Sequence, residues 1–597
     1  MSETVEVSRR TFMTGAAAVA LSASAGAQTV SAEANRESAG LGQTAGSRFD
    51  RHGSPSRKAE RAWAEAEYTH YQQRMGDGPT QQAGAGGNTS GGSGSGSPTS
   101  PSFDRVLDAV KDVGCDPSGG RSIHEDIDGS AMQDGTLIVF PPGKYLLSGQ
   151  FQASVDGTFG MVGAGYEQAS SPPKPGKNAA MIVAAGGSRT RINFRASTGL
   201  FANFVMDQRS SKSSTGIVIG SSGFVQGRDI RFVGVQDNTG EGVSDSLAIS
   251  PCALQAEEGA TARAERVVGQ YVGLPGDKNS GGAPMFWVGS GNSGTAQIGH
   301  CVSQGAADNG VYGGRTSGNV QIKGGQWVNN EVSQLRFSGT GSWADGVTLV
   351  IDKDRYKGPT SGGGFNEVFS TNGVKIERGD NGYAKAGGAV LRNADIRVGS
   401  VGSKGIGAPV LVRGSGGALK IENCRIVNNL DQPSVSAEGP GDGYSGHTSP
   451  PPHNITIAHS VFSGAQTGTI VQVSGRENSL VTKTCFTVPG SSPESVSGMK
   501  IGSGVGFGEQ CTAGGLKAPQ KVGSSGNLSS LPAPSYNGTA GVGAGRRRRK
   551  QGVLKKIIGG VFGGFLLILF LLLGAIVLIV VGVLAGFGAL AALLGGD

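Results

Sequence analysis

A six-residue pattern recurs five times in this chain and constrains its fold more than any other feature. Each copy has an apolar residue first, a small or turn-forming residue third and an apolar residue sixth. The copies begin at Val225, Ile322, Leu391, Ile421 and Ile457, and their third residues are Gly227, Gly324, Asn393, Asn423 and His459. Gly, Asn and His tolerate the positive φ angle of a sharp bend better than other residues do. Each copy therefore predicts two short strands joined by a one-residue bend.

A strand–bend–strand unit cannot bury its apolar side alone and must stack on its neighbours. The last three copies start 30 and 36 residues apart, which is typical of one coil plus a loop. These copies, together with the run GTLIVFPPGKY at 135–145, resemble the right-handed parallel β-helix proteins of the pectate-lyase-like superfamily. The resemblance covers residues 103–511 and implies an all-β solenoid. We expect an amphipathic helix over 103–113 to cap its first coil.

The six cysteines contain no CxxC pair, which argues against a zinc site. Cys424 follows a bend asparagine on a predicted strand and is expected to be a buried structural thiol. Cys485 and Cys511 bracket the last coil and could form a disulfide in an oxidising compartment.

The net charge of +7 is concentrated near the C-terminus. Seven of the 52 basic residues lie in 546–556, and the rest of the chain is almost neutral. This distribution predicts no nucleic-acid partner for the body of the protein.

The N-terminus resembles a twin-arginine export signal. Arg9 and Arg10 lie in the run SRRTFM, and an apolar stretch and small-residue cleavage candidates follow. We expect residues 1–32 to be the signal and 33–102 to be a helix-prone, then Gly/Ser-rich, linker.

The C-terminal region predicts a membrane anchor. A Gly/Ser/Pro-rich linker over 512–545 precedes the basic juxtamembrane cluster 546–556, which contains Arg546, Arg547, Arg548, Arg549 and Lys550. The apolar run 557–594 exceeds the ~20 residues that span a bilayer. It is either one long tilted helix or a hairpin of two short ones. The positive-inside rule places the cluster in the cytoplasm, whereas the export signal places the body outside; we expect an exported body displayed at the cell surface.

The candidate catalytic residues are Asp352, Asp354, Arg336 and Asp308. If Val347, Leu349 and Ile351 point inward on one strand, Asp352 and Asp354 share its outer face about 7 Å apart. That spacing suits an inverting acid/base pair or a Ca²⁺ site. The alternative is a solvated strand end in which Arg355 is a surface partner.

The stretches 308–312 and 335–337 are expected on adjacent coils, where they would offer Arg336 and an aromatic ring to a sugar.

Two functions remain open from the sequence. One is a surface module that binds glycans, such as cell-wall polysaccharide, or other partners, and needs no cofactor. The other is a polysaccharide lyase or glycoside hydrolase acting on an acidic polysaccharide, with Ca²⁺ required if it is a lyase. The resemblance implies carbohydrate chemistry, but the motif strings NTD, DD, GHG and RIK of polygalacturonase-type hydrolases are absent from the sequence. No match to the pectate-lyase calcium motif is present either.

Overall fold

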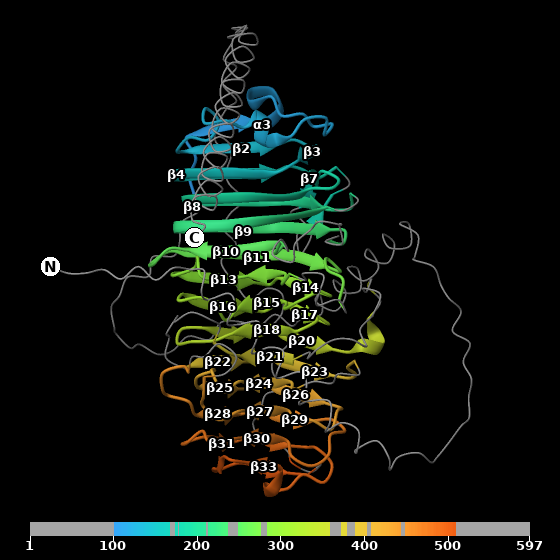
Figure 1. Ribbon diagram of the computed structural model, residues 1–597, viewed down its shortest axis with the longest axis vertical. Coiled ribbons are helices and arrows are strands. Elements are labelled where there is room, and N and C mark those ends of the chain that lie inside the picture. The colour runs from blue at the N-terminus through green and yellow to red at the C-terminus, as the bar shows by residue number, and fades with distance from the viewer. Residues whose placement is uncertain are drawn as a thin grey trace, which may run out of the picture. The chain divides into compact units, whose positions relative to one another are not determined.

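The computed structural model describes residues 101–167, 174–176, 178–210, 213–236, 249–275, 283–356, 358, 372–378, 388–402, 407–442, 448–508 and 511. Within these ranges, 33 strands form one continuous network of parallel pairings, while β5 (Tyr166–Glu167) and β6 (Lys174–Pro175) pair antiparallel. Strands of successive coils stack on one another along one axis (Figure 1). The chain therefore has a parallel β-helix fold.

The coils have three faces, each formed by one strand from every coil. Face 1 contains β10 (Cys252–Ala256), β12 (Phe286–Trp287), β15 (Val311–Gly313), β18 (Ser333–Phe337), β21 (Asn372–Ile376), β24 (Val410–Val412), β27 (Val435–Ala437), β30 (Val471–Val473) and β33 (Val496–Ser497). Face 2 contains β13 (Thr295–Gly299), β16 (Asn319–Lys323), β19 (Trp343–Asp345), β22 (Ala389–Arg392), β25 (Leu419–Glu422), β28 (Ile455–Ala458), β31 (Leu480–Thr482) and β34 (Lys500–Ile501). Face 3 contains β14 (Val302–Gln304), β17 (Gln326–Val328), β20 (Thr348–Ile351), β23 (Asp395–Val398), β26 (Arg425–Asn428), β29 (Val461–Ser463), β32 (Cys485–Phe486) and β35 (Gly506–Phe507).

The first coils use longer strands, several of which run through more than one face. They are β1 (Arg105–Asp108), β2 (Thr136–Phe140), β3 (Gly143–Leu147), β4 (Gln150–Gly163), β7 (Ala180–Ala184), β8 (Arg189–Asp207), β9 (Ser214–Val233) and β11 (Thr261–Gln270). The first part of β8 pairs with the first part of β9, which pairs with β10, so these segments belong to face 1.

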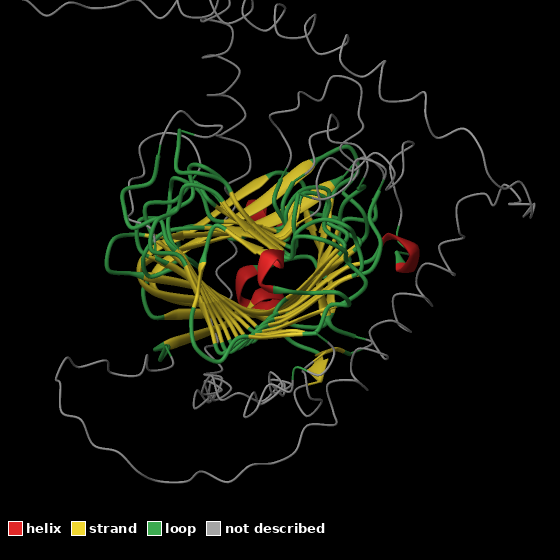
Figure 2. Cartoon of the chain, turned by 90° about the horizontal axis from the view of Figure 1, so that it is seen from below, coloured by secondary structure: helices red, strands yellow, loops and turns green. Residues whose placement is uncertain are grey.

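The N-terminal end differs from the expected amphipathic helix over 103–113. Strand β1 pairs with β2, and only the five residues of the π-helix η1 (Ala109–Val113) are helical. The prediction is wrong because pairing with the open edge of β2 satisfies the backbone of residues 105–108. Ala109 and Ile123, the latter in α3 (Ile123–Asp126), are buried in the main core. Seen along the stacking axis, helical segments lie at the centre of the ring of strands, while another lies outside it (Figure 2).

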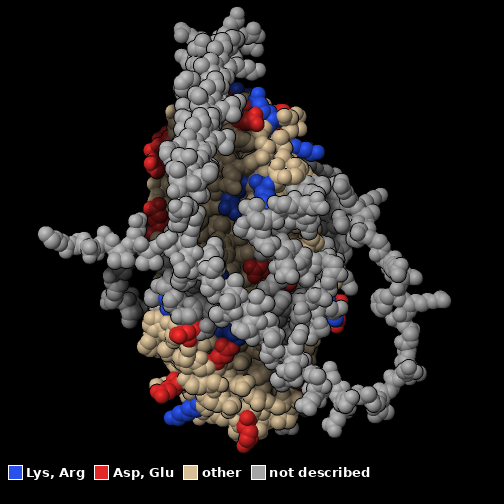
Figure 3. Space-filling view, viewed as in Figure 1, with Lys and Arg blue, Asp and Glu red and all other residues tan. Residues whose placement is uncertain are grey.

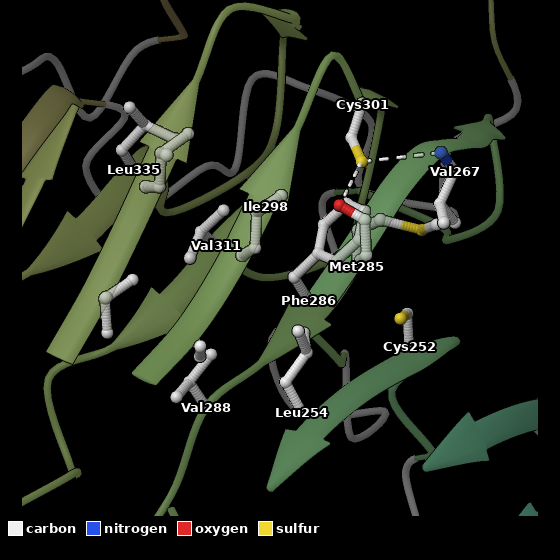
Figure 4. Packing of buried hydrophobic residues seen from close by; sticks show 14 of the residues in the cluster. Cys252, Leu254, Val267, Met285, Phe286, Val288, Ile298, Cys301, Val311 and Leu335 are labelled. Carbon is white, nitrogen blue, oxygen red and sulfur yellow. Dashed lines mark hydrogen bonds between the residues drawn. The ribbon is translucent and has the colours of Figure 1, made fainter. Parts of the chain in front are cut away.

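A single hydrophobic core runs through the stacked coils, since alternate residues of each strand point inward. Cys252, Phe286, Val311 and Leu335 come from four successive coils of face 1 and are in register with one another in this core (Figure 4). Such columns bury apolar area that no single coil could bury alone.

Four cysteines are free and buried, in accordance with the structural role predicted for Cys424. Burial raises the pKa of Cys424 to about 12. The Cys301 thiol faces the core beside Met285 and accepts a hydrogen bond of 3.4 Å from the backbone N–H of Val267 (Figure 4). These thiols are therefore packing groups rather than nucleophiles.

One residue per coil forms the bend between faces 2 and 3, and ten successive coils use the left-handed conformation there. This bend column contains Asn203, Asp229, Arg266, His300, Gly324, Gly346, Asn393, Asn423, His459 and Lys483, with φ between 46° and 68°. The predicted bends at Gly324, Asn393, Asn423 and His459 are confirmed. Asn423 donates to the side-chain oxygen of Asn393 (2.6 Å), and Asn393 donates to Asp345 (2.7 Å).

The predicted bend at Gly227 is wrong, because the positive φ lies two residues later at Asp229 (φ 55°). Gly227 faces the core instead, where an added Cβ would lie 2.3 Å from Cδ1 of Ile219. The missing side chain of Gly227 therefore leaves room for Ile219 in the core. The bend at Asp229 is held by an ion pair. Arg266, the next bend in the column, forms bonds of 2.7 and 2.8 Å to the buried Asp229 carboxylate.

The last coil is closed by a disulfide between Cys485 and Cys511, a pairing that the sequence left open. Several predictions lie outside the described residues: the twin-arginine signal with Arg9 and Arg10, the first linker as far as residue 100, the linker 512–545, the basic cluster and the apolar run 557–594. In the part of the chain that is described, no helix is both long and apolar enough to cross a bilayer.

Candidate binding site on face 1

Four large side chains form a column on the outside of face 1, which we call the outer ladder. It contains Trp287 on β12, Tyr312 on β15, Arg336 on β18 and Lys375 on β21, each in register with the next. The residues before and after them on each strand are inward-facing. Strand alternation therefore directs the ladder away from the core.

Tyr312 lies between an aromatic ring and a cation. The centroids of the Trp287 and Tyr312 rings are 4.9 Å apart in an edge-to-face arrangement. The guanidinium carbon of Arg336 is 4.1 Å from the Tyr312 centroid, and that of Arg315 is 5.5 Å from it. Both distances suit a cation–π contact. The expectation that the stretches 308–312 and 335–337 lie on adjacent coils is confirmed.

One buried carboxylate is shared by the two cations of the ladder. The Glu377 Oε2 atom is 2.8 Å from Lys375 Nζ and 3.3 Å from Arg336 Nη2, and the Glu377 side chain is 4% exposed. Burial lowers the pKa of Lys375, while Glu377 acts in the opposite direction. With Arg315, three cations lie near the two carboxyl groups of Glu377 and Asp308, so the site keeps an excess of positive charge, which favours an anionic ligand.

Asp308 precedes β15, and the charged side chains of the outer ladder influence its pKa. Burial raises its pKa to about 6, although the charges of Arg336, Lys375 and Arg315 lower it. The Asn309 side chain donates a hydrogen bond of 2.6 Å to its carboxylate. Near neutral pH this group therefore exchanges between an acid and a charged form.

These groups together suit an acidic sugar. The half-buried Trp287 ring offers apolar contact to a sugar ring, and Arg and Lys attract a carboxylate or sulfate. Burial brings the pKa of Asp308 to about 6, near the range in which general acids operate.

The other two candidate residues do not have the expected geometry. Strand β20 ends at Ile351, Asp352 is the N-cap residue of the 3₁₀-helix η4 (Lys353–Arg355), and Asp354 lies within that helix. They therefore do not share the outer face of one strand. Asp352 accepts from the Ser400 hydroxyl at 3.1 Å, and Asp354 is 72% exposed and 3.5 Å from Lys353 Nζ. Both follow a strand of face 3, whereas the outer ladder is on face 1.

Sequence reasoning missed Trp287, Lys375 and Glu377. The signal that could have found them is the alternation within β12 and β21, where each polar or aromatic residue has inward-facing neighbours. Loops of different length separate these strands, so their register could not be counted from the sequence.

A metal centre has no support from the described side chains, which include no cluster of three or more His, Cys, Asp or Glu placed to hold an ion. Within the described ranges, no group of residues is placed to bind the Ca²⁺ that is expected of a lyase.

No known family model and no curated protein matches the chain. Solved structures with similarity include the Agl-KA catalytic domain, with a TM-score of 0.39 and 13% identity over 68% of each chain. The A-module of the Azotobacter vinelandii mannuronan C-5 epimerase AlgE6 has a TM-score of 0.37 and 15% identity over 67% of this chain and 99% of that one. PfbA, a surface adhesin of Streptococcus pneumoniae, has a TM-score of 0.37 and 9% identity over 68% and 92%.

At TM-scores this low, the fold assignment rests on the strand pairing itself. The fold and the ladder define a parallel β-helix protein with an aromatic and basic outer column.

Proposed function

We propose that this chain binds an acidic polysaccharide along face 1, and that it does so at the cell surface, to which a twin-arginine signal and a C-terminal anchor deliver it. The observation that carries the proposal is the outer ladder, in which Trp287, Tyr312, Arg336 and Lys375 occupy one register position on four successive coils. A repeating array of this kind matches a polymer whose sugar rings and anionic groups also repeat.

Binding of defined polysaccharides to the full-length chain in detergent tests this proposal. Calorimetry with a uronate polymer, a sulfated polymer and a neutral polymer is expected to show binding of the acidic polymers only. Trp287→Ala and Lys375→Ala should each weaken this binding by about tenfold, because each removes one contact of the ladder. Equal affinity of the wild type for neutral and acidic polymers would contradict the proposal.

A catalytic role is the second candidate, and the raised pKa of Asp308 favours it. A general acid must be protonated at the working pH, and a carboxyl group with a pKa of about 6 meets that need in mildly acidic conditions. Hydrolysis or lyase cleavage of the same polymer would yield new reducing ends or unsaturated ends. Their formation by the wild type and their loss in Asp308→Asn would establish an enzyme, whereas binding without any cleavage product would leave a binding protein.

A further inference from the structure

A second group of cations lies on face 1, three coils before the first residue of the outer ladder. Arg189 and Arg191 are on the first segment of β8, where Thr190 and Ile192 between and beside them are fully buried. Alternation along the strand therefore directs both arginines to the outside of face 1. Lys and Arg side chains gather at the level of β8 and β9 in the space-filling view (Figure 3).

Arg189 carries buried donors that nothing in the described chain satisfies. Both of its terminal nitrogens, Nη1 and Nη2, are buried and have no hydrogen-bond partner. Ser214 is the residue of β9 that pairs with Arg189 in register, and its hydroxyl is also buried without a partner. Three unsatisfied polar atoms thus belong to two residues that are paired in register on adjacent strands. Such groups are costly to bury, so each requires an explanation.

Other arginines of the solenoid have carboxylate partners. Arg209 forms two bonds of 2.8 and 2.7 Å with Asp207, and Arg425 bonds Asp395 at 2.9 and 2.6 Å. These carboxylates raise the pKa of both arginines. By contrast, burial lowers the pKa of Arg189 and of Arg191, and no neighbouring carboxylate acts in the opposite direction. The β8 arginines therefore present uncompensated positive charge.

Small and largely buried side chains occupy the register positions between the two groups. In register with Asn193 of β8, the next outer positions are Val218 on β9 and Ala253 on β10, followed by Trp287. Five strand spacings separate β8 from β18, which corresponds to roughly 24 Å at ~4.8 Å each. A single monosaccharide cannot reach both groups, whereas an extended polymer can.

We propose that Arg189, Arg191 and Ser214 form an oxyanion site, the β8 anion site, which binds a carboxylate or sulfate of the same polysaccharide whose other anionic groups lie on the outer ladder. The span of the polymer across both sites rests on the proposed function, but the anion site itself does not. Two parallel N–H donors of a guanidinium and an adjacent hydroxyl suit two oxygens of one anion. Engagement of both sites by one chain raises the affinity through effective concentration.

Inorganic sulfate and acetate test the anion site without any polysaccharide. Calorimetry with the full-length chain in detergent is expected to show saturable binding, weakened about tenfold in Arg189→Met and in Ser214→Ala by loss of charge-assisted bonds. Arg189→Met should also raise the thermal midpoint in anion-free buffer, because it removes an unpaired buried charge, and this advantage should disappear in sulfate. Arg397→Ala is the matched control, since Arg397 lies on face 3 and is bonded to Asp395 at 2.6 Å.

Absence of sulfate and acetate binding in the wild type, or unchanged binding in Arg189→Met, would overturn the site. If Arg189→Met lowers the midpoint in anion-free buffer, the guanidinium stabilises the fold by itself and the site is likewise overturned. Stronger binding of sulfate than acetate identifies a sulfated ligand, and the reverse identifies a uronate.

Polymer length tests the span. Oligomers of a uronate and of a sulfated glycan should gain affinity sharply once they exceed the distance between the two sites, and Arg189→Met should remove that gain with length. No gain with length, together with intact sulfate binding, would reject the span and retain the anion site. Failure of every oligomer to bind the ladder would reject the proposed function alone.

Discussion

The guanidinium carbon of Arg336 lies 4.1 Å from the centroid of the Tyr312 ring, one coil away and directly in register. The contact fixes a planar cation on the outside of face 1, where Glu377 holds its other side at 3.3 Å. A guanidinium held on two sides keeps its orientation toward a ligand and loses little conformational entropy when the ligand binds.

Substitutions of Arg336 should therefore distinguish the effect of its positive charge on binding from the effect of its planar shape. Arg336→Ala is expected to weaken binding of an acidic polysaccharide by about tenfold to a hundredfold, because it removes a charge-assisted contact. Arg336→Lys should give an intermediate loss, since an ammonium group keeps the charge but not the planar stack. Calorimetry measures both, and Arg397→Ala on face 3 serves as the control. Equal affinity of Arg336→Ala and the wild type would show that the ladder is not the binding surface.

The pKa of Asp308, raised to about 6 by burial, predicts a pH dependence of binding. Below pH 6 the carboxyl group is neutral and the positive charge of the ladder is less opposed, so affinity for a sulfated polymer should rise as the pH falls from 7 to 5. A sulfate ester keeps its charge over this range. Asp308→Asn should bind at pH 7 as tightly as the wild type binds at pH 5, and its affinity should change little with pH.

The same group predicts how stability changes with pH. Because its folded pKa lies above the ordinary value of ~3.9, Asp308 contributes stability that is fully present below pH ~4 and is lost as the pH rises through about 6. The loss should amount to about 2 kcal/mol, since one pKa unit corresponds to about 1.4 kcal/mol and some solvent contact remains. Urea unfolding at pH 4, 5, 6 and 7 measures it. An identical pH profile in Asp308→Asn would contradict this assignment.

The Arg476 side chain links the backbone of neighbouring coils where the chain passes from face 1 to face 2. Its side chain donates to the backbone carbonyls of Glu438, Gly417, His453, Arg413 and Gly416, at 2.7 to 3.1 Å. Arg476→Ala should destabilise the fold by about 3–5 kcal/mol, because it leaves buried carbonyls without donors. Arg476→Lys should recover only part of this loss, since three donors cannot replace the fork of a guanidinium. Urea unfolding measures both, and a loss below 1 kcal/mol in Arg476→Ala would refute this role.

The disulfide between Cys485 and Cys511 closes a chain segment with a sequence separation of 26 residues. Its removal in Cys511→Ser should cost about 3 kcal/mol, mainly by releasing the unfolded chain from a constraint. Thermal unfolding with and without dithiothreitol measures this effect: reductant should lower the midpoint of the wild type and leave Cys511→Ser unchanged. A wild-type midpoint that is insensitive to full reduction would show that the bond adds no stability.

The fold could be predicted because bends repeat in the sequence while the core follows from alternation. Asn393 and Asn423 are both recognisable as residues that tolerate positive φ, and both are bends. Arg266 and Lys483 are bends too, but no propensity indicates them, because neighbouring side chains and coils fix their conformation. The bend predicted at Gly227 was wrong for the opposite reason: a glycine is present there because a Cβ atom would clash with Ile219.

The candidate site was predictable only in part. Tyr312 and Arg336 lie 24 residues apart with no long insertion between them, so their adjacency could be anticipated from the sequence. Lys375 lies 39 residues after Arg336, and its place beside Arg336 depends on strand register that only the folded chain reveals. The acidic pair was misjudged because nothing in the sequence marks the end of β20 at Ile351. The alternation of Arg189 and Arg191 with Thr190 and Ile192 was visible, but their lack of carboxylate partners was not.

The bend column makes each coil an exchangeable module. Asn393 and Asn423 adopt the same φ of 53°, lie 30 residues apart and are joined side chain to side chain. A gene recombined between two such positions would lose or gain one whole coil, while every remaining strand keeps a partner in the same register. The core would need no new packing arrangement, and only the length of the outer surface would change. Duplication and deletion at bends thus give such a protein a direct route to match polymers of different length.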